Sequence, residues 1–343
     1  MRYIIIGAGA IGGGIGGRLH ESGQEVVLVA RGPHLTALRA DGLRFSTPEG
    51  GTRTLRVPAV GGPEELELGP EDVLVLAVKT QHSAGLLEAW SGRPVAGGDG
   101  TTGGGTAGES LPLLCAQNGV ENERLALRWF RRVYGVAVWM PATHLEPGRV
   151  AVPGAPLSGF LHLGRCPAPT GPDPTAHAIA ADLEGARFRA PVQEDVMRWK
   201  YGKLIGNLGN ALDALTDPAG PAEQAAVAEL YRRARAEGEA VLTAAGIPYA
   251  SVAEQLEQRG ELMELVPLEG VELGGSSSRQ SLARGAGSIE ADYLNGEITL
   301  LARLHGVPAP VNETLRRLAT AYAREGRAPG SLPVAELEAL LAR

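Results

Sequence analysis

The stretch MRYIIIGAGAIGGGIGGRLHESGQEVVLVARG, residues 1–32, decides the fold. Residues 3–6 form a short apolar run rich in isoleucine, which is typical of a strand buried on both faces of a parallel sheet. A glycine-rich turn at 7–12, a helical stretch to residue 20 and a second apolar run at 25–30 follow. Strand, turn, helix and strand within about 30 residues predict a βαβ unit.

The turn GAGAIG has the spacing of a dinucleotide-binding loop. In such a loop the first glycine makes the tight turn, the second lets backbone approach a pyrophosphate, and the third lets the helix pack closely on the strand. The N-terminus of the helix then offers N–H groups to the phosphates. We interpret the turn as a cofactor site rather than a merely structural turn. The expected cofactor-binding residues are Gly7, Ala8, Gly9, Ala10, Ile11 and Gly12.

The residue after the second predicted strand indicates which cofactor binds. An NAD site carries Asp or Glu about 20 residues beyond the loop, where it bonds the ribose 2′-hydroxyl. This chain has Arg31, nineteen positions beyond Gly12. Because a guanidinium suits bidentate contact with a 2′-phosphate, we expect NADP(H). The alternative is that Arg31 is a solvated surface residue in an arginine-rich chain.

Two more polar side chains follow predicted strands of the same sheet. Lys79 comes directly after the apolar run 72–78, and Asn118 follows the run 111–116. Open α/β sheets bind ligands at the carboxyl ends of their strands, so the pair favours a cofactor site over loop residues that satisfy local backbone groups. Further strands are expected at 55–60, at 132–138 and at 161–164, which would close the sheet, and a mobile loop is expected at 92–110.

From about residue 192 the apolar residues recur at helical spacing. The predicted fold is an α/β, Rossmann-like dinucleotide-binding domain at 1–191, followed by an all-α domain at 192–343. Gly246 has the position of a residue that ends a helix. Helices are expected at 194–214, 222–246, 252–264, 288–305 and 311–326.

Composition excludes several classes of protein. A net charge of −7 over 343 residues argues against a nucleic-acid-binding surface. Two cysteines cannot form a disulfide framework, which favours a reducing compartment, and we expect a cytoplasmic protein. No apolar run approaches the ~18 residues of a membrane span. The seven histidines show no metal-binding pairing, so no metal is expected.

The segment RWKYGKLIGNLGNAL, residues 198–212, carries the candidate catalytic group. Lys203, Asn207 and Asn210 are spaced i, i+4 and i+7, which places them on one face of a continuous helix. That face could simply be the wet side of an amphipathic helix, but asparagine is a poor choice inside a helix. Only three of the 32 basic residues are lysines, so a lysine here indicates chemistry that arginine cannot do.

With these motifs in this order, the chain resembles the ketopantoate reductase (2-dehydropantoate 2-reductase) family over nearly its whole length. The resemblance includes GAGAIG at 7–12, the Lys79 strand end and the QNG turn at 117–119. It continues through KLIGN at 203–207, GSIEADYLNG at 287–296 and HGVPAPVN at 305–312.

The resemblance implies NADPH-dependent reduction of a small-molecule 2-keto acid, ketopantoate or a related compound, to the 2-hydroxy acid in pantothenate biosynthesis. It implies that Lys203 is the general acid and that Glu290 supports substrate and cofactor binding. It implies substrate contacts for Asn207 and Asn210 and for a serine that is either Ser277 or Ser278. The chemistry agrees, because hydride arriving at a keto carbon leaves an alkoxide that an ammonium can stabilise and protonate.

Some residues depart from the family pattern. The second asparagine follows Asn207 by three residues where the family has four, and the stretch 138–141 is bulkier than is usual. The substrate can therefore differ from ketopantoate. Two alternatives stay open: an NADP-dependent dehydrogenase of a larger hydroxy-acid or opine-like substrate, and a non-catalytic NADP-binding regulator, against which Lys203 and Glu290 argue. Stereochemistry and oligomeric state, including a homodimer, also stay open.

Overall fold

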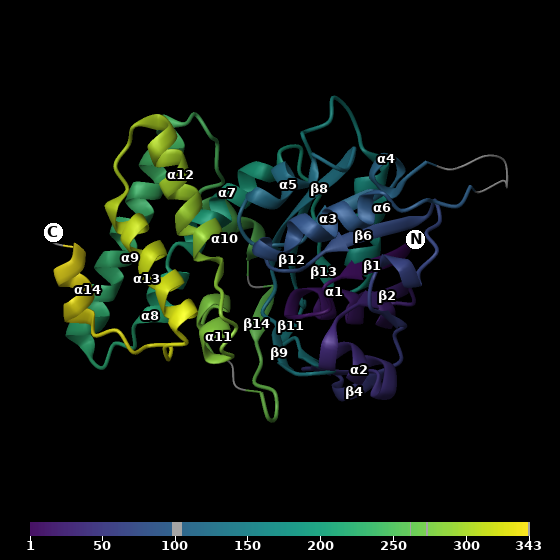
Figure 1. The fold of residues 1–343 in the computed structure, drawn as a ribbon, viewed down its shortest axis with the longest axis horizontal. Helices are drawn as coiled ribbons and strands as arrows, with labels where there is room; N and C mark the ends of the chain where they lie inside the picture. The colour runs from purple at the N-terminus through teal and green to yellow at the C-terminus, as the bar shows by residue number, and fades with distance from the viewer. Residues whose placement is uncertain (98–104, 261, 272–273, 342–343) are drawn as a thin grey trace. The chain divides into compact units, whose positions relative to one another are not determined.

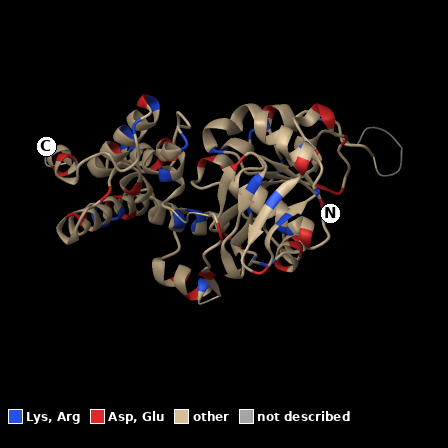
Figure 2. Cartoon of the chain, turned by 90° about the horizontal axis from the view of Figure 1, so that it is seen from below, with Lys and Arg blue, Asp and Glu red and all other residues tan. Residues whose placement is uncertain are grey.

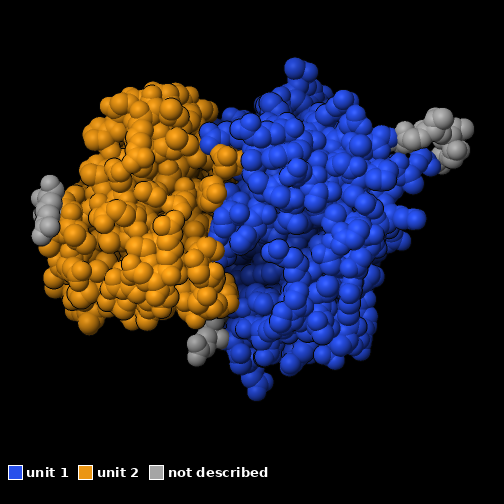
Figure 3. Space-filling view, in the orientation of Figure 1, with its two compact units in different colours: residues 1–117, 122–199, 253–272 blue, residues 118–121, 200–252, 273–343 orange. Residues whose placement is uncertain are grey.

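The structure is a computed structural model that describes residues 1–97, 105–260, 262–271 and 274–341 (Figure 1). Its contacts divide the chain into two compact units (Figure 3). The sheet unit comprises residues 1–117, 122–199 and 253–272, and the helical unit comprises 118–121, 200–252 and 273–343.

This division differs from the predicted one at 191/192. The start of helix α7 (Val196–Asn207) stays with the sheet unit, since Trp199 stacks on His162 with ring centroids 4.4 Å apart. Residues 253–272 return to the sheet unit because β14 (Met263–Leu265) pairs with β11 (Gly154–Pro156). Both features depend on contacts between residues far apart in the chain, which local patterns do not reveal.

The sheet unit is built on an eight-stranded sheet in the order β13-β12-β8-β7-β6-β1-β2-β5. Its pairs are parallel except for β8 with β12, so the sheet has the parallel character that the first 32 residues predict. The strands are β1 (Arg2–Ile6), β2 (Glu25–Val29), β5 (Ala59–Val60), β6 (Asp72–Leu76), β7 (Pro112–Cys115), β8 (Arg132–Trp139), β12 (Gly159–Cys166) and β13 (Phe188–Arg189).

Apolar side chains fill both faces of this sheet. Tyr3 and Ile5 of β1 point into a core that also contains residues of α1 (Ala10–Glu21) and α6 (Pro174–Gly185). Ile4 and Ile6 point into the opposite core. Alternate side chains of a strand point to opposite faces, so a strand covered on both sides reads as a continuous apolar run. The second core is completed by α3 (Ser83–Ser91), α4 (Ala107–Ser110) and α5 (Glu121–Ala126).

A second sheet has the order β4-β3-β10-β9. The predicted strand at 55–60 is wrong, because residue 55 ends β4 in this sheet whereas only 59–60 join the large sheet. The strand predicted at 161–164 does not close the large sheet, because β13 pairs beyond it. The remaining elements here are α2 (Gly32–Asp41), β3 (Leu43–Thr47), β4 (Gly51–Leu55), η1 (Pro63–Glu65), η2 (Thr80–His82), β9 (Thr143–Glu146) and β10 (Arg149–Ala151).

The stretch 92–110, expected to be a mobile loop, is ordered at both ends. Pro94 forms a β-bridge with Thr106, and a capping box between Thr106 and Glu109 opens α4. Residues 98–104 lie outside the described residues.

The helical unit confirms an all-α second domain with several corrected boundaries. The helix predicted at 194–214 is two helices, the one at 252–264 ends at Arg259, and the one at 288–305 begins as a short 3₁₀ turn. Gly246 has φ of +65° and follows α9 as predicted. After α7 the helices of this unit are α8 (Asn210–Leu215), α9 (Pro221–Ala244), α11 (Ser277–Ala283), η3 (Glu290–Tyr293), α12 (Asn295–His305), α13 (Pro310–Glu325) and α14 (Val334–Leu341), whereas α10 (Val252–Arg259) lies in the sheet unit from residue 253 onward.

Charges of both signs are interspersed over the elements of both units (Figure 2). Among the described residues, no helix is long and apolar enough to cross a membrane, and no group of three or more His, Cys, Asp or Glu side chains could hold a metal ion.

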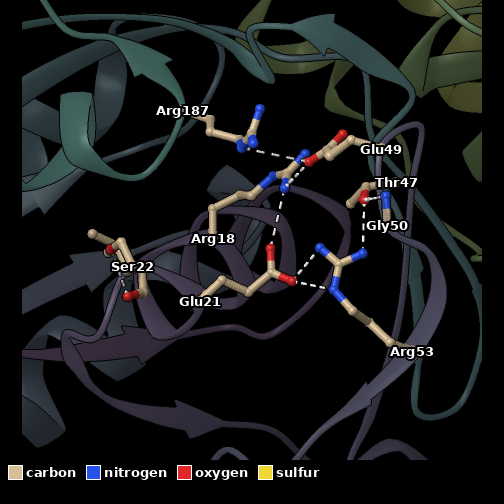
Figure 4. Close-up of polar contacts among 9 residues, drawn as sticks. Arg18, Glu21, Ser22, Thr47, Glu49, Gly50, Arg53 and Arg187 are labelled. Carbon is tan, nitrogen blue, oxygen red and sulfur yellow. Dashed lines mark hydrogen bonds and ion pairs between the residues drawn. The ribbon is translucent and has the colours of Figure 1, made fainter.

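One charged side chain of α1, that of Arg18, is buried (Figure 4). Arg18 is 2% exposed, and its guanidinium forms ion pairs with Glu21, at 3.1 Å, and with Glu49. Glu21 also pairs with Arg53, and Arg18 and Arg53 both lie over the Phe45 ring, with guanidinium carbons 5.7 and 5.9 Å from its centroid. The network therefore ties the end of α1 to the β3–β4 hairpin.

We expect Arg18→Ala to lower the free energy of unfolding by about 1–3 kcal/mol, because removal leaves Glu49 without its main partner. The decrease in the free energy of unfolding should be smaller than for a fully buried ion pair, because the Glu21 and Glu49 side chains are 18% and 31% exposed. Arg232→Ala is the control, because Arg232 pairs with Glu229 on an exposed face of α9. That variant should leave the urea unfolding midpoint close to that of the wild-type protein, because exposed ion pairs contribute little to stability. Equal losses would contradict the account of this network.

Candidate active site

The glycine turn between β1 and α1 has three glycines with three different surroundings. Gly7 has φ of +103°, and a Cβ there would lie 2.6 Å from Val78 Cγ1. A Cβ on Gly12 would lie 2.0 Å from the Gly7 carbonyl oxygen, so α1 starts in direct contact with the turn. Around Gly9 no described atom lies within 4 Å of a built Cβ. The open space at Gly9, next to the N-terminus of α1, therefore suits a pyrophosphate.

The turn lies where the strand order reverses. Strand β1 pairs with β2 on one side and with β6 on the other, so the chain moves outward in both directions from β1. In open α/β sheets this reversal leaves a crevice at the carboxyl ends of the strands, where ligands bind. Residues 7–12 follow β1, and Lys79 lies three positions beyond the end of β6.

His34 fixes the backbone of the glycine turn, and sequence reasoning missed it. Its Nδ1 accepts a hydrogen bond from the Gly148 N–H at 2.8 Å, so the ring proton is on Nε2, which donates to the Ala8 carbonyl at 2.8 Å. Burial lowers the pKa of His34, and the bond to Ala8 only partly opposes this effect. The neutral ring of His34, which is part of α2, thus links the glycine turn at Ala8 to that helix.

The positive charges of Arg31 and Lys79 both act on the side chain of His82. Burial lowers the pKa of His82, and the positive charges of Arg31 and Lys79 lower it further. Arg31 is exposed at the start of α2, and Lys79 precedes η2. The two cations predicted from strand ends therefore lie near the same histidine and raise the positive potential there. His82 carried no sequence signal, because its neighbourhood depends on the pairing of β2, β1 and β6.

In the helical unit, Lys203 is held by the turn that carries Asn118. The Lys203 Nζ donates to Asn118 Oδ1 at 2.8 Å. Gly119, with φ of +75°, lets the turn approach η3, since a Cβ there would lie 2.9 Å from the Tyr293 carbonyl oxygen. Asn118 was predicted to bind the cofactor; the contact that the structure provides is with the candidate general acid.

The surroundings of Lys203 favour its neutral form. Burial of the ammonium lowers its pKa to about 7, the charge of Lys200 contributes to this decrease, and the carboxylate of Glu290 opposes it. Lys200 lies one helical turn earlier on α7 and is 2% exposed. Glu290 opens η3 and is 9% exposed. The predicted residues Lys203 and Glu290 are therefore close enough for the charge of Glu290 to act on the Lys203 ammonium. A lysine with this pKa can give up a proton near neutral pH.

We expect Lys200→Met to raise the pKa of Lys203, because the variant removes a nearby positive charge. If a protonated Lys203 is needed for turnover, kcat/KM of the wild-type enzyme falls as pH rises above about 7. The variant should shift that fall to higher pH, because the charge of Lys200 is one of the causes that lower the Lys203 pKa. Lys200→Arg keeps the charge and should keep the wild-type profile. Identical profiles for Lys200→Met and wild type would exclude this coupling.

Asn207 and Asn210 lie on either side of a helix break, so the prediction of one continuous helix face is wrong. Asn207 is the last residue of α7, and Asn210 is the first of α8. Gly209 lies between them, packed so closely on the Tyr231 ring that a Cβ would meet it at 2.9 Å. The buried Nδ2 of Asn207 has no hydrogen-bond partner in the described part of the chain. A buried donor of this kind suits an acceptor group on a ligand.

The serines near this break have different positions. Ser276 Oγ donates to the Asn210 carbonyl at 3.3 Å, and the Ser276 N–H donates to Asp213 at 2.7 Å. Ser277 is exposed at the start of α11, whereas Ser278 is 3% exposed. Ser276, which precedes the two predicted candidates, thus forms hydrogen bonds with the Asn210 segment.

Comparisons with known proteins agree with this geometry. The profile of the family described as "Ketopantoate reductase PanE/ApbA" matches residues 3–167, and that described as "Ketopantoate reductase PanE/ApbA C terminal" matches residues 195–323. A 2-dehydropantoate 2-reductase of Mesorhizobium japonicum is 30% identical over 93% of this chain and 98% of the relative.

Two solved structures are similar over nearly the whole chain. A PanE/ApbA family ketopantoate reductase from Ralstonia eutropha JMP134 has 27% identity and a TM-score of 0.74, covering 95% of this chain and 99% of that one. A D-mandelate dehydrogenase solved with NADH and anilino(oxo)acetate has 21% identity and a TM-score of 0.75, covering 96% and 100%. The second similarity concerns the fold alone.

Proposed function

Because the chain belongs to the ketopantoate reductase (PanE/ApbA) family and is an oxidoreductase, we propose that it reduces a 2-keto acid to the 2-hydroxy acid with NADPH. The observation that carries the proposal is Lys203, which is desolvated, hydrogen-bonded to Asn118 at 2.8 Å and close enough to Glu290 for its charge to be felt. Ketopantoate is the first substrate to test, with a place in pantothenate biosynthesis.

Lys203 acts as the general acid in this proposal. The bound nicotinamide supplies the hydride, and the protein must then neutralise the charge on the former keto oxygen. The Lys203 ammonium donates a hydrogen bond to that oxygen and gives it the proton. Glu290 favours the charged form of the ammonium before transfer, and Asn118 directs its Nζ. A lysine can release this proton readily, and an arginine cannot.

The amide groups at the α7–α8 break bind the substrate in this proposal. Asn207 offers its unpaired Nδ2 to a carboxylate or hydroxyl oxygen of the acid. Asn210 and the serines of 276–278 complete the substrate side, with Ser276 added to the predicted Ser277 and Ser278 because it contacts the Asn210 segment.

The cofactor site favours NADPH over NADH. Residues 7–12 would hold the pyrophosphate, and Arg31 would bind the 2′-phosphate, with Lys79 adding positive charge near His82. An NAD-type acid at position 31 would instead repel that phosphate. Two observations support the preference for NADPH. Position 31 carries an arginine, and the charges of Arg31 and Lys79 both lower the pKa of His82.

We expect Arg31→Ala to weaken NADPH binding by about 2 kcal/mol, roughly 30-fold, and to change NADH binding little. The dissociation constants of both cofactors, measured by fluorescence titration, check this. Arg39→Ala is the control, since Arg39 lies on α2, which Arg31 precedes, and pairs with Glu65. Equal weakening of NADPH and NADH by Arg31→Ala would exclude a role for Arg31 in cofactor choice.

Oxidation of NADPH, followed at 340 nm with a panel of 2-keto acids, tests the activity itself. The panel should include ketopantoate, shorter aliphatic keto acids and aromatic keto acids, because the bulky stretch 138–141 can alter the substrate. The reverse assay with NADP⁺ and larger hydroxy acids or opine-like compounds tests the dehydrogenase alternative. Binding of NADPH without turnover of any compound would favour the regulatory alternative.

A further inference from the structure

A buried network of amides runs through three helices of the helical unit. Asn295, the first residue of α12, is fully buried, and its Nδ2 donates to the Leu208 carbonyl at 3.1 Å and to Asn312 Oδ1 at 3.0 Å. Asn312 on α13 is also fully buried. Both hydrogen bonds are made by a side chain and neither is part of a helix backbone, so helix formation alone does not explain why these amides are buried.

The far end of the network fixes the orientation of Asn312. Its Nδ2 donates to the Ala234 carbonyl at 2.8 Å and to Glu237 Oε2 at 2.9 Å. The backbone N–H groups of Val311 and Asn312 also donate to the Glu237 carboxylate, at 2.9 and 3.0 Å. Because both Nδ2 hydrogens of Asn312 are used on α9, its Oδ1 must face Asn295. Asn295 is thereby held with its donor directed at Leu208.

The carbonyl that Asn295 binds lies at the break between α7 and α8. The last carbonyls of a helix have no intrahelical partner, and a buried one needs a donor from elsewhere. Leu208 lies directly after Asn207 and two positions before Asn210. The same Asn295 follows η3, which begins at Glu290, by two residues. One side chain therefore connects the segments that carry Asn207, Asn210 and Glu290.

We propose that Asn295 is a positioning residue that fixes the helix break, and with it the two asparagines, for binding of the keto acid. Asn312 and Glu237 support it by holding its amide in one orientation. The proposal rests on the proposed function, because the asparagines bind a keto acid only if that function holds. It assigns to Asn295 no contact with substrate or cofactor.

The test compares Asn295→Leu with Asn312→Leu, two buried substitutions in the same network. Asn295→Leu removes the donor to Leu208, so KM for the keto acid should rise by about tenfold or more. The dissociation constant of NADPH should change by less than about twofold, since the glycine turn belongs to the sheet unit. Asn312→Leu removes the acceptor that orients the Asn295 amide but leaves the Asn295–Leu208 bond possible, so it should lower Tm and raise KM by less than Asn295→Leu does, by about threefold or less.

A purely structural role predicts a different pattern. Both variants would then lower Tm and the amount of active enzyme while KM stays at the wild-type value, and that result would overturn the proposal. If a leucine variant does not fold, the alanine variants at the same two positions serve in its place. A wild-type enzyme that reduces no keto acid would count against the proposed function instead.

Hydrogen exchange tests the positioning without substrate. In Asn295→Leu, amides of residues 206–213 should exchange at least about tenfold faster, and those of α9 should keep their wild-type rates. Unchanged exchange at 206–213 would overturn the proposal whatever the activity of the enzyme.

Discussion

Replacing Lys203 by methionine is expected to lower kcat by about 10²–10⁴-fold, the range that a positioned general acid contributes. The variant removes both the proton and the positive charge from the position held by Asn118. NADPH binding should be nearly unchanged, because the glycine turn and Arg31 belong to the sheet unit. Steady-state rates with the best keto acid and a fluorescence titration with NADPH check both parts.

Lys203→Arg separates charge from proton transfer. Arginine retains the positive charge and can still donate a hydrogen bond, but it does not release a proton at working pH. We expect this variant to be nearly as inactive as Lys203→Met. If Lys203→Arg retained most of the activity, Lys203 would only stabilise charge, and the proton would come from another group.

Replacing Gly12 by alanine is expected to weaken NADPH binding by about 100-fold. The new Cβ would lie 2.0 Å from the Gly7 carbonyl oxygen and 3.0 Å from Ala77 Cβ. Both neighbours are held in the turn and the strand end, so the start of α1 must move away from the position that suits the pyrophosphate.

Gly185→Ala is the matched control for this substitution. Gly185 ends α6 in the same unit, and a Cβ there would meet no described atom within 4 Å. It should leave NADPH binding and Tm unchanged. Circular dichroism separates lost binding from lost folding in Gly12→Ala. Wild-type affinity in a folded Gly12→Ala protein would contradict the role given to the turn.

The sequence predicted the sheet unit well where local pattern and final environment agree. The run at 3–6 is buried on both faces, and the positive φ of Gly7 and the close packing at Gly12 are what a dinucleotide turn requires. The strand at 55–60 failed for a physical reason. An apolar run does not show which sheet it will join, and residues 55 and 59 joined different ones.

In the helical unit, local sequence patterns did not predict the helix break or the long-range hydrogen bonds. Apolar spacing continues through residues 194–214, so the break at Leu208 and Gly209 was not predictable from periodicity. Asn295, 87 positions further along the chain, binds the Leu208 carbonyl. The bond between Lys203 and Asn118 likewise joins residues 85 positions apart. The sequence identified the residue types of the site, and long-range contacts decide which of them meet.

The most direct test of the account is a single-turnover experiment with NADPH bound to excess enzyme and mixed with a 2-keto acid. Absorbance at 340 nm reports loss of NADPH. The account predicts rapid loss with the wild-type enzyme and, with Lys203→Met, loss slowed by about 10²–10⁴-fold although NADPH is bound equally well. Equal rates for the two proteins, or no loss with any 2-keto acid, would contradict it.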